Sequence, residues 1–308
     1  FKIFNSFRSY YPDSNNLLVR LFSFFDKNPQ LDNQTDELLY KSLQTGNKID
    51  PLKIFQLIGL LHQKQKGAEK IVNTDKRKHF GIYYTDYSIA RLIAKESLSE
   101  SNKEGLLGLS FYEPCSGTGI FVIAYIDEVL GRVGNLDHKT FQKFINKIYF
   151  SDIDAEAIEL LIKLLPLYVK SKYGVSIKIN PKNYFKGDVL FKTINGEIEK
   201  VNPKQIFGVV NGFDVVLTNP PFGAKIPVVG DQLLGQYELG HVWGNDGNGN
   251  WAVSNKLLDK QPPQILFIER CLQLLKEGGR LGIVLPEGIF GNPSDKYIWE
   301  YISSVASV

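Results

Sequence analysis

From Phe80 onward, short apolar runs alternate with longer segments whose apolar residues recur at helical spacing. This alternation constrains the fold more than any other feature, because strands separated by helices pair in parallel and need helices on both faces of the sheet. The sequence therefore predicts an α/β fold built on a parallel sheet. The expected strands are Leu109–Glu113, Ile148–Asp152, Phe213–Thr218 and Arg280–Leu285, and the expected helices are Ile120–Leu130, 138–148, Ala155–Val169 and Ile265–Lys276.

The first 75 residues show a different pattern, which predicts a helical N-terminal domain. Helices are expected near residues 17–25 and 36–43. A third helix is expected to begin at Asp50-Pro51, because aspartate caps helices and proline suits their first position. We expect two domains, a helical one over residues 1–75 and one that contains the sheet over residues 76–308.

The composition excludes several classes of protein. Of the 308 residues, 43% are apolar and 22% charged, which rules out collagen-like, mucin-like and wholly disordered chains. The 36 Lys and Arg exceed the 33 Asp and Glu by only three, so any surface that binds nucleic acid must be local. Two cysteines and four scattered histidines show neither a disulfide framework nor metal-ligand spacing, so we expect a reducing compartment and no metal. No run approaches the roughly 18 apolar residues of a membrane span, and the N-terminus has no signal-peptide core, so we expect a soluble cytoplasmic protein.

A glycine-rich turn, Glu-Pro-Cys-Ser-Gly-Thr-Gly at residues 113–119, follows the first expected strand. Glycines in such a turn let the backbone approach a ligand at the carboxyl edge of the sheet. The dinucleotide pattern needs a third glycine where this chain has Val122. The acidic residue before the turn would repel a pyrophosphate and attract a cationic amino-acid group. The residues of this candidate site are Glu113, Pro114, Gly117 and Gly119.

Two acidic residues follow the next two strands. Asp152 ends the strand Ile148–Asp152, and its carboxylate can accept hydrogen bonds from both ribose hydroxyls of a nucleoside. Asp188 follows a further short strand and is suited to accept from an adenine amino group. A solvated loop acid is the alternative for each, but the upstream Glu113 and glycine turn favour a nucleoside site.

The most specific motif is Asn219-Pro220-Pro221-Phe222, directly after the strand Phe213–Thr218. Proline fixes φ and has no N–H, so nearby carbonyl groups face outward rigidly. The Asn219 side-chain oxygen and the Pro220 carbonyl can both accept from one planar NH2 group, which directs the nitrogen lone pair at an electrophile. Phe222 offers a face on which a base can stack. A tight turn is the alternative, but the buried strand and the neighbouring nucleoside site favour the catalytic interpretation.

Together these motifs resemble the S-adenosylmethionine-dependent DNA adenine-N6 methyltransferases. Their order is Gly-x-Tyr-Tyr-Thr at residues 81–85, Glu-Pro-x-x-Gly-x-Gly at 113–119, Asp-x-Asp at 152–154 and Asn-Pro-Pro-Phe at 219–222. The resemblance covers about residues 76–300 and is greatest to the gamma arrangement of type I modification subunits and fused restriction-methyltransferases. It implies a Rossmann-like methyltransferase sheet, S-adenosylmethionine as cofactor, and methyl transfer to a flipped-out DNA adenine within a restriction-modification system.

The resemblance also implies a role for each residue of the glycine turn. Glu113 would face the ammonium group of the cofactor, with Pro114 next to it. Gly117 and Gly119 would line the methionine part of the cofactor.

The nucleoside part of the cofactor would be held by the later acidic residues. Asp152 would bind the ribose, with Ile153 against the adenine ring and Asp188 near the adenine amine. Thr85 would contact the cofactor from upstream. Family proteins commonly have proline after this threonine, whereas this chain has Asp86, which also suits the first turn of a helix.

The reaction implied by the resemblance is an in-line displacement at the sulfonium methyl group, for which positioning and a polarised amine suffice. The Asn-Pro-Pro-Phe motif would hold the target adenine, which must leave the duplex to be reached. Two alternatives are a glutamine-N5 methyltransferase that acts on release factors and a non-catalytic scaffold that binds S-adenosylmethionine or DNA. Phe222 in place of tyrosine and the upstream Tyr-Tyr-Thr disfavour the first, and the intact motif disfavours the second.

Three further segments carry expectations. Residues 64–78 contain six basic and two acidic residues, which indicates a solvated linker or, near a DNA site, a contact to the phosphate backbone. Residues 240–255 are rich in Gly and Asn and predict a mobile loop. The two tryptophans in this loop indicate either contact with a ligand or disorder alone.

The third segment is the end of the chain. The sheet of the family continues beyond Arg280–Leu285, where this chain soon stops. The chain also contains no methionine, not even an initiator, which indicates that its start is missing as well. We expect a methyltransferase domain that is truncated at its C-terminus, in a chain that is part of a longer protein or depends on a separate specificity subunit. The expected partners are double-stranded DNA, a specificity subunit and a restriction subunit, with no membrane.

Overall fold

The computed structural model describes residues 44–45, 48–69, 85–99, 101–194, 197–223, 227–246 and 251–308. The helices expected near residues 17–25 and 36–43, the side chains of residues 64–78 and the Gly-x-Tyr-Tyr segment at 81–84 lie outside this description. Within the described ranges, no helix is long and apolar enough to cross a membrane.

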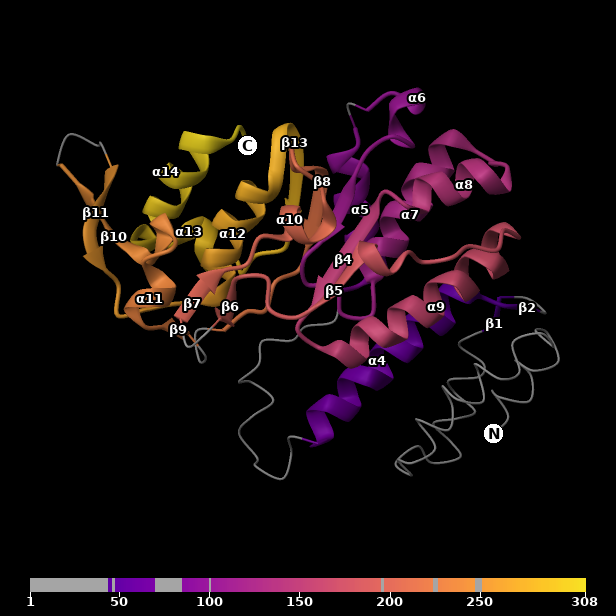
Figure 1. Ribbon diagram of the computed structural model, residues 1–308, viewed down its shortest axis with the longest axis horizontal. Coiled ribbons are helices and arrows are strands. Elements are labelled where there is room, and N and C mark those ends of the chain that lie inside the picture. The colour runs from indigo at the N-terminus through magenta and orange to yellow at the C-terminus, as the bar shows by residue number, and fades with distance from the viewer. Residues whose placement is uncertain are drawn as a thin grey trace.

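Five parallel strands form the central sheet in the order β13-β8-β3-β4-β5 (Figure 1). They are β3 (Phe111–Glu113), β4 (Ile148–Asp152), β5 (Tyr184–Lys186), β8 (Phe213–Thr218) and β13 (Leu275–Ile283). The strand order reverses between β3 and β8, which is the switch point where ligands bind at the carboxyl ends of a Rossmann-like sheet. The predicted α/β class and the parallel sheet are confirmed.

Helices cover both faces of the sheet, because alternate strand residues point to opposite sides. Phe111 of β3 packs into one apolar cluster and Tyr112 into another. The first cluster includes α5 (Tyr87–Ser97), α7 (Ile120–Val133), α8 (His138–Ile145) and α9 (Ala155–Tyr173). The second includes α10 (Pro203–Phe207) and α12 (Pro263–Leu274).

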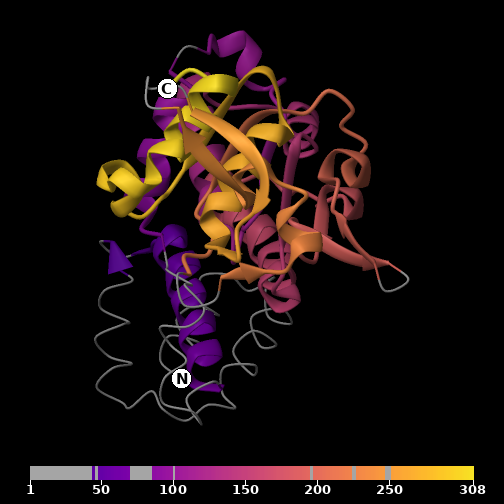
Figure 2. The same cartoon turned by 90° about the vertical axis from the view of Figure 1, so that its left-hand side faces the viewer.

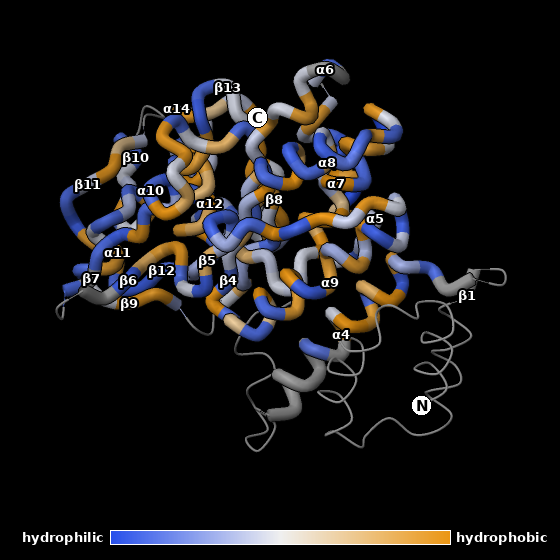
Figure 3. Tube along the Cα trace, turned by 45° about the vertical axis from the view of Figure 1, so that its right-hand side comes forward, coloured by the Kyte–Doolittle hydropathy of each residue, from blue (hydrophilic) through white to orange (hydrophobic). Residues whose placement is uncertain are grey.

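The helix α4 (Pro51–Glu69) begins where the sequence predicts, since the Asp50 carboxylate accepts from the Leu52 N–H at 2.9 Å. It packs against α9, and the Phe55 and Tyr168 rings meet edge to face at 5.7 Å. Figure 3 shows hydrophobic residues in both helices where they lie side by side. Figure 2 shows α4, in indigo, at the end of the molecule opposite the C-terminus.

The boundary predicted between the last helix and the last strand of the sheet is wrong. The helix α12 ends at Leu274 and not at Lys276, and β13 begins at Leu275, because Leu275 pairs with Phe213 of β8. A register shift before Arg280 then takes up the two glycines, so they form an irregularity inside the strand and not a separator in front of it.

The expected mobile loop at 240–255 is also wrong for its described part. β10 (His241–Asn245) and β11 (Trp251–Leu257) pair as antiparallel strands. The Trp243 indole N–H donates to the Glu238 carbonyl at 3.0 Å, and its ring packs on Tyr301. These contacts outweigh the loop-forming composition.

The other described elements are short or peripheral. They are β1 (Gln44–Thr45), β2 (Lys48–Ile49), α6 (Lys103–Leu106), η2 (Pro181–Asn183), β6 (Phe191–Ile194), β7 (Glu197–Lys200), β9 (Val228–Val229), α11 (Asp231–Leu234), η3 (Glu238–Gly240), β12 (Lys260–Gln261), α13 (Gly288–Gly291), η4 (Pro293–Asp295) and α14 (Lys296–Val305).

Candidate functional site

The glycine turn joins β3 to α7 and contains two glycines with different constraints. Gly119 has φ +95°, and a Cβ atom there would overlap the Leu161 side chain of α9. Gly117 has φ +49°, but nothing lies within 4 Å of where its Cβ would be. Gly119 is therefore required for packing between the turn and α9, whereas Gly117 borders open space that a ligand can enter.

Glu113 is the last residue of β3 and is 1% exposed. Its carboxylate accepts the Val122 backbone N–H at 3.2 Å. Burial raises the pKa of Glu113 well above its usual range, and the nearby Asp152 raises it further. Among the described residues, no Lys, Arg or His forms an ion pair with this carboxyl. A buried carboxyl of this kind suits a cationic ligand group, whose charge would favour its ionised form.

Asp152 ends β4 and closes the turn from the next strand. One carboxylate oxygen accepts the Gly117 N–H at 2.7 Å, and the other accepts the Asp154 N–H at 2.8 Å. Burial raises the pKa of Asp152. A carboxylate has about four acceptor positions, so two hydrogen bonds leave capacity for ligand hydroxyls. Ile153 follows with 73% of its surface exposed, which is an apolar surface suited to a flat ring.

Asp188 lies beyond the end of β5. The Gly187 N–H donates to the Asp152 carbonyl at 2.9 Å, so this segment is tied to the end of β4. The Asp188 carboxylate accepts the Leu190 N–H at 2.7 Å, and burial raises the pKa of Asp188. The three acidic residues predicted from sequence therefore lie at the carboxyl ends of three adjacent strands, two as the last residue of the strand and one just beyond it.

The Asn-Pro-Pro-Phe segment leaves the end of β8, next to β3 in the sheet. The Asn219 Nδ2 donates to the Thr85 Oγ1 at 2.9 Å, and Thr85 is buried just before α5. Pro220 is buried, while Pro221 and Phe222 are half-buried. The sheet thus brings the expected acceptor residues to the edge that carries Glu113 and the glycine turn.

Two supporting contacts were not predicted from the sequence. The Gly223 N–H donates to the buried Gln264 Oε1 of α12 at 3.1 Å. His62 of α4 is buried, and its Nε2 lies 3.0 Å from the Asp154 Oδ2, two residues after Asp152. No local pattern marks either residue, because each acts through a contact distant in sequence.

Comparison with known proteins identifies a family. The model of the Eco57I restriction-modification methylase family matches residues 146–305. A search of curated proteins finds no match. A solved DrdV–DNA complex shares the fold, with a TM-score of 0.55 and 16% sequence identity, over 84% of this chain and 25% of that one.

Two further solved structures are similar at lower scores. A type I restriction-modification methyltransferase subunit from Streptococcus thermophilus is 17% identical, over 90% of this chain and 49% of that one, with a TM-score of 0.47. The type IIL restriction-modification enzyme MmeI in complex with DNA is 16% identical, over 84% of this chain and 36% of that one, with a TM-score of 0.49. The chain spans half or less of the length of these proteins.

Proposed function

The chain belongs to the Eco57I restriction-modification methylase family, and we propose that it transfers a methyl group from S-adenosylmethionine to the N6 amine of an adenine in DNA. The observation that carries this proposal is the junction of two motifs at the switch point of the sheet. Glu113, a buried carboxyl suited to an ammonium group, ends β3. Asn219, a carboxamide suited to a planar amine, follows the adjacent β8.

The residues present fit S-adenosylmethionine. Glu113 would bind its ammonium group, and the open space at Gly117 would accept its methionine part. Asp152 has acceptor capacity for the ribose hydroxyls, and Ile153 offers an exposed apolar surface for the adenine ring. Asp188 would accept from the adenine amine. When bound, the cofactor supplies a sulfonium methyl group that is already a strong electrophile.

The chain then has to position and polarise the target amine. The Asn219 side-chain oxygen and the Pro220 carbonyl would accept its two N–H groups, which keeps the lone pair available on the opposite side. Both acceptors are preorganised, since Pro220 and Pro221 fix the backbone and Thr85 holds the Asn219 carboxamide. The proton lost from the methylated nitrogen passes to solvent, so no covalent intermediate with the protein is needed.

A target adenine inside a duplex lies out of reach of these acceptors, so it would be flipped out of the stack. Stacking on Phe222 would offset part of the cost, by about 1–3 kcal/mol for a base on an aromatic ring. We propose double-stranded DNA as the substrate.

The test uses S-adenosylmethionine that carries an isotopic label in its methyl group and measures where that label is transferred. The full-length protein is incubated separately with DNA from a methylation-deficient host and with a peptide release factor. Nucleosides and peptides are then analysed by mass spectrometry. We expect N6-methyldeoxyadenosine from the DNA and no label on the release factor. Label on a glutamine of the release factor, or cofactor binding by calorimetry without transfer to either substrate, would contradict the proposal.

A further inference from the structure

The Thr85 hydroxyl contacts the side chain that is central to the proposed reaction. The Asn219 Nδ2 donates to it at 2.9 Å, and the two residues lie in segments far apart in sequence. Thr85 is 8% exposed, so little water competes for this hydrogen bond. Because the two terminal atoms of a carboxamide point in different directions, a bond that fixes Nδ2 also fixes the direction of Oδ1.

We propose that Thr85 is a positioning residue, whose hydroxyl accepts from Nδ2 and so holds the Asn219 carboxamide with Oδ1 toward the target amine. This inference rests on the proposed function. In the opposite orientation, the Asn219 Nδ2 would turn its N–H groups toward the N–H groups of the amine. Donors would then face donors, and the amine would lose one of its two acceptors. While the Thr85 hydroxyl accepts from Nδ2, the Asn219 carboxamide is held in the productive orientation before the substrate arrives.

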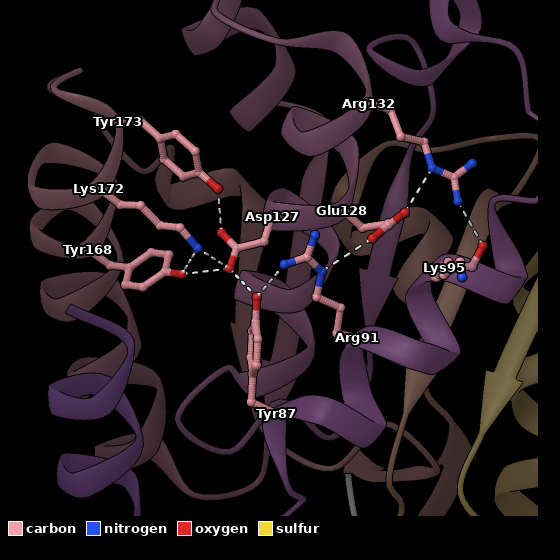
Figure 4. A network of polar contacts seen from close by, with 9 residues as sticks. All are labelled: Tyr87, Arg91, Lys95, Asp127, Glu128, Arg132, Tyr168, Lys172 and Tyr173. Atoms are coloured by element: carbon pink, nitrogen blue, oxygen red, sulfur yellow. Dashed lines mark hydrogen bonds and ion pairs between the residues drawn. The ribbon is translucent and has the colours of Figure 1, made fainter. Parts of the chain in front are cut away.

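The start of α5, just after Thr85, is held by its own N-terminal cap and by contacts to α7. The Asp86 carboxylate caps α5 by accepting the Ser88 N–H at 2.8 Å. The next residue, Tyr87, donates its hydroxyl to Asp127 of α7 (Figure 4). One turn later, the Arg91 Nε lies 3.3 Å from a carboxylate oxygen of Glu128, also on α7.

Asp127 is itself held in a buried network. It is 2% exposed and accepts from the Tyr168 hydroxyl at 2.6 Å and from the Lys172 Nζ at 2.6 Å, both on α9 (Figure 4). Because α7 begins at the glycine turn, α5 is anchored to the helix that starts at the cofactor site. Thr85 therefore sets the acceptor side chain relative to the cofactor turn, although the resemblance alone implies only a contact to the cofactor.

Two substitutions of Thr85 distinguish a role in positioning Asn219 from a role in binding the cofactor. Thr85→Val removes the hydroxyl at nearly constant shape, and Thr85→Ser retains it. At saturating cofactor and DNA, we expect Thr85→Val to lower kcat about 3- to 10-fold, as expected for the loss of one hydrogen bond. The cofactor Kd, measured by calorimetry, should stay within about twofold of the parent value, and Thr85→Ser should recover most of kcat. A weaker cofactor Kd with unchanged kcat would overturn the proposal and assign Thr85 to the cofactor.

A second measurement decides the proposal without methyl transfer. The Asn219 side-chain NH2 resonances of the 15N-labelled full-length protein are identified by their loss in Asn219→Asp. We expect solvent exchange of these hydrogens to be slow in the parent and in Thr85→Ser, and at least about threefold faster in Thr85→Val. Equal exchange in the parent and Thr85→Val would overturn the positioning role. Absence of DNA methylation by the parent, in contrast, would overturn only the proposed function.

Discussion

The proposed site has two halves, a cofactor half at the ends of β3 and β4 and an acceptor half at the end of β8, and the two are supported in different ways. In the cofactor half, the turn and the strand end hold each other, since both oxygens of Asp152 accept backbone N–H groups from Gly117 and Asp154. In the acceptor half, side chains from other elements provide the support, with Thr85 holding Asn219 and a glutamine of α12 holding the segment after it.

The halves also differ in their electrostatics. The proposed cofactor half contains a buried carboxyl, Glu113, whose pKa is raised by burial and by Asp152. Ionisation of this carboxyl lowers the stability of the ligand-free protein, and a bound cation would offset that loss. The acceptor half relies on neutral acceptors, an amide and a carbonyl. We therefore expect substitutions in the cofactor half to change cofactor affinity, and substitutions in the acceptor half to change the rate of methyl transfer.

The largest effect is expected for Asn219→Ala. Loss of one of two preorganised acceptors should lower kcat about 100- to 1,000-fold, while the cofactor Kd measured by calorimetry stays within about twofold. The matched control is Asn135→Ala, which removes an exposed carboxamide far along the chain and should leave both quantities at the parent values. Parent-like methylation by Asn219→Ala would break the assignment of the acceptor half.

Glu113→Gln should change cofactor affinity and not the rate of methyl transfer. Replacing the carboxylate with a neutral amide removes a charge-assisted hydrogen bond to the ammonium group, so we expect the cofactor Kd to rise about 10- to 100-fold. Glu96→Gln, an exposed substitution of the same kind, is the control. An unchanged Kd in Glu113→Gln would contradict the electrostatic role of the cofactor half.

The same variant has a pH signature. A carboxyl with a raised pKa in the folded protein binds its proton more tightly than in the unfolded chain, so its contribution to stability falls as the pH rises above the ordinary glutamate pKa. Glu113→Gln removes this penalty, and we expect its Tm without ligand to exceed the parent Tm at neutral pH and to approach it in acid. Cofactor affinity should rise with pH in the parent, as Glu113 ionises, and stay flatter in the variant.

Substitution of the two glycines of the turn should have smaller effects on stability and on cofactor binding than the substitutions of Asn219 and Glu113. Gly119→Ala places a methyl group into Leu161 at a positive φ, so we expect a loss of about 1–3 kcal/mol in the free energy of unfolding, measured with urea. Gly117→Ala meets no atom within 4 Å and should cost less stability, but its methyl group enters the space assigned to the ligand and should weaken cofactor binding. Equal effects of both on stability and binding would remove the distinction between the packing glycine and the ligand-facing glycine.

Much of the fold was predictable because its signals are local. The strands Phe111–Glu113 and Ile148–Asp152 are apolar runs that end in an acidic residue, and Phe213–Thr218 is followed by an Asn-Pro pair. A strand in this class of sheet has its binding residues at that end. The candidate residues could therefore be assigned to one edge before their distances were known.

The remaining features depend on contacts between distant segments. The start of β13 at Leu275 is decided by pairing with Phe213, which the glycines after it do not indicate. Trp243 packs on Tyr301 and turns an Asn- and Gly-rich stretch into paired strands. The bond from Asn219 to Thr85 likewise joins two elements that meet only through tertiary packing.

The smallest effect concerns the anchor of α5. Tyr87→Phe removes one hydroxyl that donates a hydrogen bond to the Asp127 carboxylate. The hydroxyls of Tyr168 and Tyr173 and the Lys172 amine still stabilise that carboxylate. We expect a loss of about 0.5–1.5 kcal/mol in the free energy of unfolding and an unchanged cofactor Kd.

Tyr173→Phe is the matched control, because it removes a hydrogen bond to the same carboxylate from α9 instead of α5. Both variants should lose similar stability, but only Tyr87→Phe loosens the helix that begins beside Thr85, so only it should lower kcat, by at most about twofold. If the two variants lower kcat equally, the network stabilises the fold without bearing on Asn219, and the acceptor half depends on the Thr85 hydroxyl rather than on the anchoring of α5.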